Sequence, residues 1–339
     1  MQKNLSISIN IWLIALALIV LSMIAVGGLT RLTESGLSMV DWQLIMGVIP
    51  PLNQSDWLQL FEDYKQYPEY QIKNLNMNLD EFKYIFWWEY SHRVLGRLIG
   101  IIFIIPFVYF SLKNSFSKSE YKFYFILLLL GSFQGLIGWW MVKSGLEMNP
   151  YVSHFRLAVH LILAQIILSL IFFQLLKRTV KDQYEKIDNQ HLGLFITFNL
   201  IILLTVIYGA FMAGLDAGQS FNTWPKMGEN YIPENLIFWD EKFWGIFENS
   251  VFIHFFHRIL AYSSLVIILF IFWFGYRKIQ NNTQRIHLLI IGFLVFVQLV
   301  IGVMVVLTNV EISMGSLHQI IGTMIFILST SYSLSILRH

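Results

Sequence analysis

The sequence predicts an all-α polytopic membrane protein whose eight transmembrane helices form two tandem four-helix bundles, related by a pseudo-twofold axis along the membrane normal. Three observations support this prediction. The chain is 56% hydrophobic and only 13% charged, which is more apolar surface than one soluble core can bury. Eight apolar runs approach the roughly 20 residues that a membrane crossing needs. The two halves of the chain also share an internal repeat.

The first apolar run is interpreted as a retained membrane span and not as a secretory signal. Its apolar stretch is too long for a signal, and no small-residue cleavage site precedes its polar exit. The eight expected spans lie at residues 9–28, 92–112, 122–142, 155–176, 191–213, 254–275, 286–307 and 315–336.

The orientation follows from the positions of the basic residues, because short cytoplasmic loops are enriched in Lys and Arg. The long loops 29–91 and 214–253 share the opposite side and carry many acidic residues. Both termini are therefore expected in the cytoplasm and the long loops outside. The cations on the cytoplasmic side are Lys3, Lys113, Lys118, Lys122, Lys177, Arg178, Lys181, Arg277, Lys278, Arg285 and Arg338.

The two long loops resemble each other, and the resemblance continues into the helices that follow. Two pairs of residues repeat at a constant offset of 182, and a Gln with a Gly four residues later recurs further along. We therefore expect two halves, residues 1–178 and 179–339, with four helices each. The matched residues are Gly36 with Gly218, Trp42 with Trp224, Gln134 with Gln298, and Gly138 with Gly302.

Two histidines in each half suggest the chemistry. The chain has no cysteine, which excludes thiolate sites and leaves histidine and carboxylate as the main candidates. His92, His160, His257 and His318 are each expected within a turn or so of the outer end of a span, so that the two rings of each half face one another. Two neutral imidazoles make a six-coordinate b-type haem site. A net charge of +2 gives no indication of nucleic-acid binding.

A planar porphyrin needs space beside its ligands, and a small residue follows each histidine by four positions. Close helix packing through small residues is the alternative reading. Arg93 and Arg258 follow two of the histidines directly and could pair with haem propionates, although cations reaching towards the membrane surface would look the same. The small residues are Gly96, Ala164, Ala261 and Gly322.

The halves differ three residues before their first histidine, where Glu89 stands in one and His254 in the other. A carboxylate beside a haem could act as a general base for water or stabilise positive charge on a substrate. The alternative is a solvated loop acid. His154 and His254 are weaker candidates for supporting the ligands. His191, His287 and His339 lie outside the repeat and are read as interfacial or loop residues.

Several of these segments resemble the haem A synthase family, in the branch shared by alphaproteobacteria and mitochondria. The resemblance covers nearly the whole chain. The segments are Gly-Gly-Leu-Thr-Arg-Leu-Thr-Glu-Ser-Gly-Leu-Ser at 27–38, Glu-Tyr-Ser-His-Arg at 89–93, Phe-Arg-Leu-Ala-Val-His-Leu at 155–161, Phe-His-Arg at 256–258 and Leu-His-Gln at 317–319.

The resemblance implies a membrane enzyme that oxidises the C8 methyl group of haem O to a formyl group, giving haem A for cytochrome oxidase. It implies that His92 and His160 ligate the substrate haem, that His257 and His318 ligate a b-type haem, and that Glu89 is catalytic. It also implies a bacterial inner membrane, with haem O synthase and oxidase assembly proteins as candidate partners. No residue indicates the electron acceptor. Some relatives carry a cysteine pair that this chain lacks.

Two other functions fit parts of the pattern. A di-haem b-type electron-transfer subunit would use the same histidine pairs, but Glu89 and the asymmetry between the halves argue against it. A transporter with histidines along its path would explain the repeat, but histidines at one depth fit it poorly.

Overall fold

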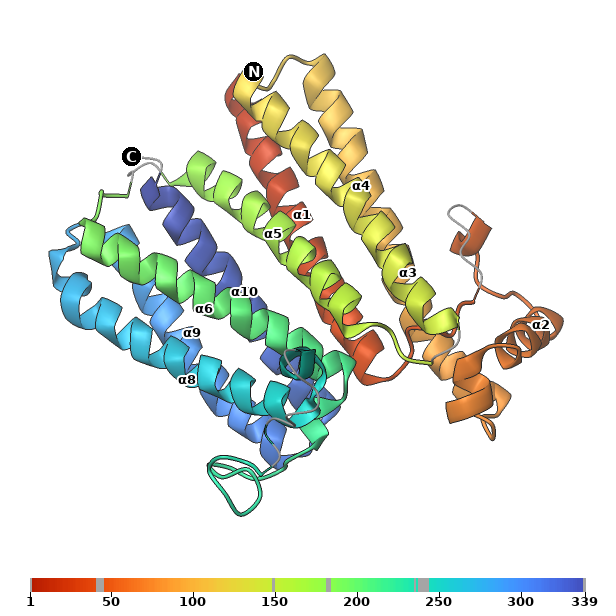
Figure 1. Ribbon diagram of the computed structural model, residues 1–339. Helices are drawn as coiled ribbons and strands as arrows, with labels where there is room; N and C mark the ends of the chain where they lie inside the picture. The colour runs from red at the N-terminus through yellow and green to blue at the C-terminus, as the bar shows by residue number, and fades with distance from the viewer. Residues whose placement is uncertain are drawn as a thin grey trace. The chain divides into compact units, whose positions relative to one another are not determined.

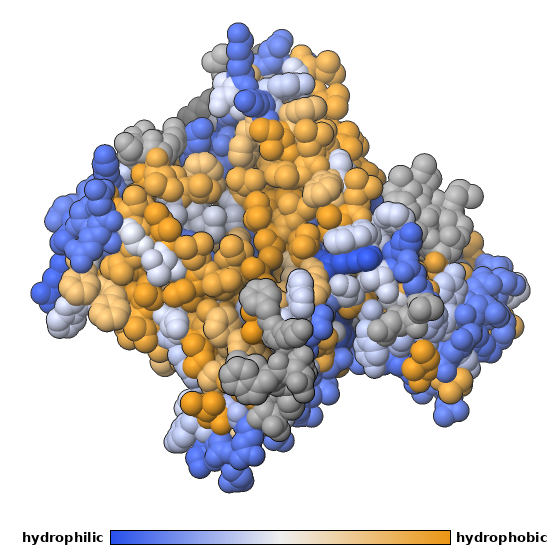
Figure 2. All heavy atoms as spheres, viewed as in Figure 1, coloured by the Kyte–Doolittle hydropathy of each residue, from blue (hydrophilic) through white to orange (hydrophobic). Residues whose placement is uncertain are grey.

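The computed structural model describes residues 2–40, 46–147, 150–180, 184–234, 236 and 244–337. Trp42, Lys181 and Arg338, with His339, lie outside the described residues. Helices dominate, and the described part of the chain contains no β-strand. Eight of these helices are long and apolar enough to cross a membrane, so the prediction of an all-α polytopic membrane protein is confirmed. Figure 2 shows apolar side chains over much of the exposed surface of these helices.

The chain divides into two compact units, Met1–Ala164 and Gln165–His339. The boundary falls inside α5, His154–Thr179. The axis relating the two halves, and the expected functional boundary at residue 178, stay predictions.

In the first unit, α1 packs on α3, and α3 packs on α4 and on the short helix α2 (Figure 1). Trp12 of α1 ties this packing together, since its Nε1 donates to the Ile102 carbonyl at 2.9 Å and its ring lies among Phe103, Phe110 and Tyr124. The elements of this unit are α1 (Gln2–Leu32), η1 (Met46–Val48), α2 (Gln54–Lys65), η2 (Glu69–Lys73), α3 (Leu79–Leu112), α4 (Lys118–Leu146) and the first part of α5.

The structure corrects the start of the second span, because α3 begins at Leu79 and not at residue 92. Asn78 caps it, accepting hydrogen bonds from the backbone N–H groups of Asp80 and Glu81. The region expected as a loop also carries α2, whose Phe61 and Tyr64 pack against Phe82 of α3. We call residues 46–78 the helical cap. His92 consequently lies more than three turns inside its helix.

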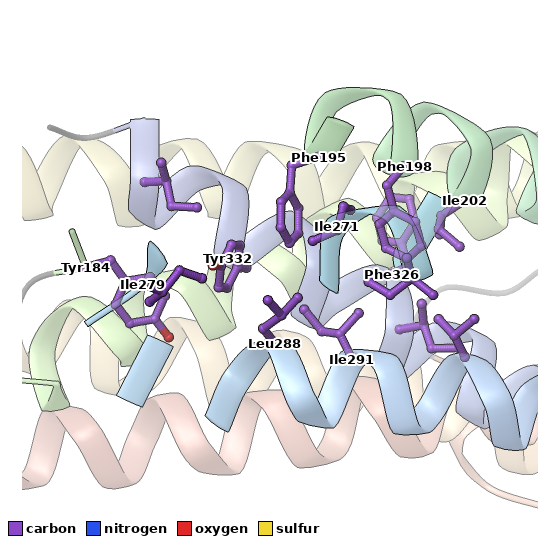
Figure 3. Close-up of a cluster of buried hydrophobic side chains, with 14 residues drawn as sticks. Tyr184, Phe195, Phe198, Ile202, Ile271, Ile279, Leu288, Ile291, Phe326 and Tyr332 are labelled. Carbon is purple, nitrogen blue, oxygen red and sulfur yellow. The ribbon is translucent and has the colours of Figure 1, made fainter. Parts of the chain in front are cut away.

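The second unit is a more closed bundle. In it α6 packs on α8, α9 on α10, α10 on α6 and α8 on α9. Its core lies between these four helices, where side chains such as Phe195, Phe198, Leu288, Phe326 and Tyr332 meet (Figure 3). The elements of this unit are the rest of α5, α6 (Asn189–Gly214), η3 (Ala217–Gln219), α7 (Gly245–Glu248), α8 (Ser250–Gly275), η5 (Tyr276–Lys278), α9 (Asn282–Leu307) and α10 (Ile312–Leu337).

Candidate functional site

In the second unit, the structure brings His257 of α8 and His318 of α10 together. Their ring centroids lie 6.4 Å apart with an interplanar angle of 62°. Two imidazoles bound to one metal at about 2 Å, on opposite sides, place their centroids about 6.3 Å apart, because the ring radius adds about 1.1 Å on each side. The separation therefore suits a single iron held between the two rings.

The unbonded nitrogens of this pair agree with such a role. Nδ1 of His257 and Nδ1 of His318 are buried and have no hydrogen-bond partner among the described residues. Burying a polar group without a partner costs free energy. Among the described residues no group of three or more His, Asp or Glu side chains could hold a bare metal ion. A porphyrin supplies four of the six iron ligands itself, so a histidine pair is sufficient for haem.

In the first unit, His92 lies on α3 and His160 on α5. Both rings are partly exposed. The predicted pairing of histidines has a measured geometric counterpart in the second unit, between His257 and His318. Their role as iron ligands stays a prediction.

Sequence reasoning noted two glutamines as repeated residues but gave them no role. Gln134 of α4 donates from Nε2 to the His160 carbonyl at 2.9 Å, and the same amide lies 3.2 Å from His160 Nδ1. Gln298 of α9 lies 3.2 Å from His318 Nε2. The second histidine of each pair thus contacts an amide of the preceding helix. Their recurrence in the repeat was the signal that could have assigned them.

Glu89 is buried in the first unit, with only 3% of its surface exposed, so the solvated-acid reading is wrong. Its Oε1 accepts a hydrogen bond from Arg93 Nη2 at 2.6 Å. Its Oε2 accepts from Ser38 Oγ and from the Met39 backbone N–H, both at 2.8 Å. Arg93 also donates to the Met39 carbonyl at 2.7 Å. Glu89 and Arg93 therefore hold the segment after α1 against α3.

The second unit repeats this arrangement with a neutral partner. Arg258 Nε donates to His254 Nε2 at 3.1 Å, and its Nη1 donates to the carbonyls of Thr223 and Lys226 at 3.0 and 3.4 Å. His254 is fully buried. Each arginine thus ties its own loop to a histidine-bearing helix. Nη2 of Arg258 is buried without a hydrogen-bond partner among the described residues.

The small residues predicted to make room for a porphyrin have mixed surroundings. A Cβ atom added to Gly96 would lie nearest to Met23, at 3.4 Å, and one added to Gly322 nearest to Gln298, at 3.1 Å. His154 begins α5 and packs on Phe155. The porphyrin role of Gly96, Ala164, Ala261 and Gly322 stays a prediction.

His191 and His287 are buried, which corrects their reading as interfacial or loop residues. Tyr184 and His287 Nδ1 share a hydrogen bond of 2.6 Å. His191 lies in the first turn of α6, and the capping residue Asp188 accepts a hydrogen bond from the His191 backbone N–H at 2.8 Å. Both residues are parts of the helix packing in the second unit.

These features define a class: an all-α, multi-pass membrane protein with a facing pair of histidines inside a helix bundle. Residues 10–330 match the family COX15-CtaA, described as cytochrome oxidase assembly protein. The chain belongs to this family.

Relatives resemble the chain over most of its length. It is 41% identical to the heme A synthase of Pelagibacter ubique over 315 residues, covering 92% of this chain and 91% of that protein. It is 40% identical to the heme A synthase of Nitrosospira multiformis, covering 92% and 88%. It is 37% identical to that of Cereibacter sphaeroides, covering 94% and 85%.

Proposed function

We propose that this chain is a haem A synthase, which oxidises the C8 methyl group of haem O to a formyl group with oxygen taken from water. The observation that carries the proposal is the histidine pair of the second unit, whose 6.4 Å separation suits one haem iron, in a chain 41% identical to a protein named heme A synthase. Family membership alone would not specify where the chemistry occurs.

The first half is proposed to bind the substrate. His92 and His160 hold haem O, with the reacting methyl edge near Glu89. An ionised carboxylate offers about four acceptor positions, and Glu89 uses three of them on Arg93, Ser38 and Met39. One position remains, which suits a single water molecule. Glu89 therefore orients that water and takes its proton, or stabilises positive charge at the attacked carbon.

The reaction balances with water as the oxygen source. In the first round the methyl group gains a hydroxyl from water and loses two electrons and two protons. A second round gives a gem-diol, which loses water to leave the aldehyde. The four electrons must leave the substrate half, so an acceptor is required in addition to water.

The second half is proposed to hold a b-type haem between His257 and His318, which would carry electrons onward from the substrate. The chain's own residues fix and orient this group. Arg258 has a buried Nη2 that still lacks an acceptor, so it fits a haem propionate. Arg93 is less suited to that task, because its Nη2 already serves Glu89 and Met39.

The proposal places the protein in a bacterial inner membrane, with both termini in the cytoplasm and the long loops outside. Haem O is the substrate partner. An enzyme that makes haem O and the proteins that assemble cytochrome oxidase are candidate partners.

The test is to produce the wild type and Glu89→Gln alongside a source of haem O, and to identify the extracted haems by pyridine haemochrome spectra and mass spectrometry. Wild type should yield haem A and haem B. Glu89→Gln should yield haem O and haem B, with haem A formation at least 100-fold slower.

Glu62→Gln is the matched control, because Glu62 is an exposed acid of α2 that pairs with Lys65. It should make haem A like the wild type. Recovery of haem B alone from the wild type would favour a di-haem electron-transfer subunit instead. Full conversion by Glu89→Gln would remove the catalytic role of Glu89.

A further inference from the structure

Each of the four paired histidines lies against a glycine of the helix that packs beside it. A Cβ atom placed on any of these glycines would come within 2.9 to 3.3 Å of an imidazole atom. Ordinary contacts between such atoms begin at about 3.5 Å. The contacts join Gly27 to His92 at 2.9 Å, Gly138 to His160 at 3.0 Å, Gly209 to His257 at 3.3 Å and Gly302 to His318 at 3.0 Å.

The contact is not a general property of glycines in these helices. Gly131 and Gly135 lie on α4 with Gly138, and Gly193 lies on α6 with Gly209, yet a Cβ atom on any of the three would meet nothing within 4 Å. Four of the glycines whose added Cβ would crowd a histidine ring contact the paired histidines, one for each, and a further one, Gly275, contacts His191.

We infer that these four glycines position the haem ligands. Each glycine lets one imidazole ring lie close to the neighbouring helix and so fixes where that ring sits relative to its paired ring. The inference rests on the proposed function, since it treats the rings as ligands. An added methyl group would push the ring by several tenths of an ångström. Metal–nitrogen bonds tolerate deviations of only about 0.2 Å, so the displaced ring would bind the iron weakly or not at all.

Substituting one of these glycines should therefore affect the haem of one half only. Gly27 and Gly138 lie against histidines of the first half, while Gly209 and Gly302 lie against histidines of the second. At Gly302 the ring has little freedom to swing aside, because the Gln298 amide contacts it as well. At Gly209 the contact is the longest of the four, so alanine there should have the mildest effect.

The experiment compares Gly302→Ala, Gly209→Ala and Gly193→Ala, each purified as the full chain and selected by its elution at the wild-type size. Haem B per protein is measured by pyridine haemochrome, and axial ligation by electron paramagnetic resonance. Gly302→Ala should lose at least fivefold of the low-spin signal, either as lost haem or as conversion to a high-spin form. Gly209→Ala should lose less, and Gly193→Ala should match the wild type.

Gly138→Ala and Gly131→Ala form the same comparison for the first half. Gly138→Ala should lose bound haem O while its b-type haem keeps the wild-type spectrum, and this retained haem shows that the variant is folded. A merely structural glycine would lower the amount of protein without changing the spin state of one haem. If Gly302→Ala cannot be purified as folded protein, the haem content and spin state of Gly209→Ala decide the result.

The outcomes separate the two proposals. Wild-type low-spin spectra in Gly302→Ala and Gly209→Ala would overturn the positioning role and leave the haem sites standing. A wild-type protein that binds no haem would overturn the proposed function itself.

Discussion

Each half of this protein has an arginine directly after a paired histidine, and the two arginines make similar contacts. Only the arginine of the first half has a charged partner. Arg93 and Arg258 each follow a paired histidine and each hold carbonyl groups of the preceding loop. Arg93 is paired with the carboxylate of Glu89, whereas Arg258 donates to the neutral ring of His254.

The difference supports the proposal that the two halves have different roles. A buried carboxylate can stabilise positive charge on a substrate or accept a proton from water, and a neutral imidazole that already accepts from arginine can do neither as well. The first half therefore has a group suited to chemistry. The second has an arginine with a nitrogen still available, which suits holding a permanent group.

The largest expected effect comes from removing a ligand in either half. His318→Ala should lose the b-type haem and its low-spin signal while substrate haem still binds. His160→Ala should lose the substrate haem while the b-type haem remains. Haem analysis of the two purified variants checks both results, and each variant serves as the control for the other. Loss of the same haem from both would contradict separate sites.

The next largest effect comes from replacing Glu89 of the first half with histidine, the residue that the second half has at the matching position, His254. Glu89→His should retain both haems and slow haem A formation by about 100-fold to 10,000-fold, because the group that orients water or stabilises charge is gone. The measurement is the rate of haem O conversion in purified protein. The reciprocal variant His254→Glu should keep the b-type haem without oxidising it. Rapid conversion by Glu89→His would show that the asymmetry has no catalytic meaning.

The arginines should differ in their importance for stability. Arg93→Ala leaves the Glu89 carboxylate buried without its cation, at a cost of about 3 to 5 kcal/mol. Arg258→Ala leaves neutral acceptors, at a cost of about 1 to 3 kcal/mol. Thermal unfolding in detergent should therefore show the larger loss for Arg93→Ala. Equal losses of thermal stability in the two variants would mean that the ion pair between Arg93 and Glu89 stabilises the protein no more than the hydrogen bonds of Arg258.

Much of this fold was predictable because membrane spans are recorded in the sequence as long apolar runs. All eight expected spans correspond to helices that could cross a membrane. The predicted start of α3 was wrong because charged residues such as Asp80, Glu81 and Lys83 interrupt the apolar residues of its first turns, so a hydropathy pattern reads them as part of the loop. The cap helix α2 was missed for the same reason, since its apolar face is contributed by only a few residues such as Phe61 and Tyr64.

The site was partly predictable. Repetition pointed to the four histidines and to the contrast between Glu89 and His254. It could not show that Glu89 is buried, because this depends on Ser38 and Met39 folding back onto α3. Nor could it show which glycines touch the histidines. Spacing along one helix pointed to Gly96 and Gly322, whereas the glycines nearest the rings lie on neighbouring helices, where only packing decides the contact.

The smallest expected effect concerns the helical cap, which has no counterpart of this kind among the described residues of the second half. Glu69 is 4% exposed, and its Oε2 accepts a hydrogen bond from Tyr64 Oη at 2.9 Å. Burial raises the pKa of Glu69 to about 7. In that pKa, the nearby Glu89 and Glu34 act in the same direction as burial, while the Tyr64 hydroxyl and Lys73 act against it.

Because the pKa is raised in the folded state, folding favours the protonated acid. Protonated Glu69 contributes its full stabilisation below a pH of about 4.5, the ordinary pKa of Glu. This stabilisation is lost as the pH rises through about 7. Between pH 5 and pH 8 the cap should lose about 2 kcal/mol. Glu69→Gln should remove most of this dependence, since an amide keeps an acceptor for Tyr64 and carries no charge.

The measurement is the rate at which a protease cleaves the cap, residues 46–78, in wild type and Glu69→Gln at both pH values. The ratio of the wild-type cleavage rate to the Glu69→Gln cleavage rate at each pH cancels the protease's own pH dependence. The wild type should be cleaved relatively faster at pH 8, and the exposed-acid variant Glu62→Gln should follow the wild type. A ratio that does not change with pH would show that Glu69 stays ionised inside the folded cap, and the first half would then hold two buried carboxylates in place of one.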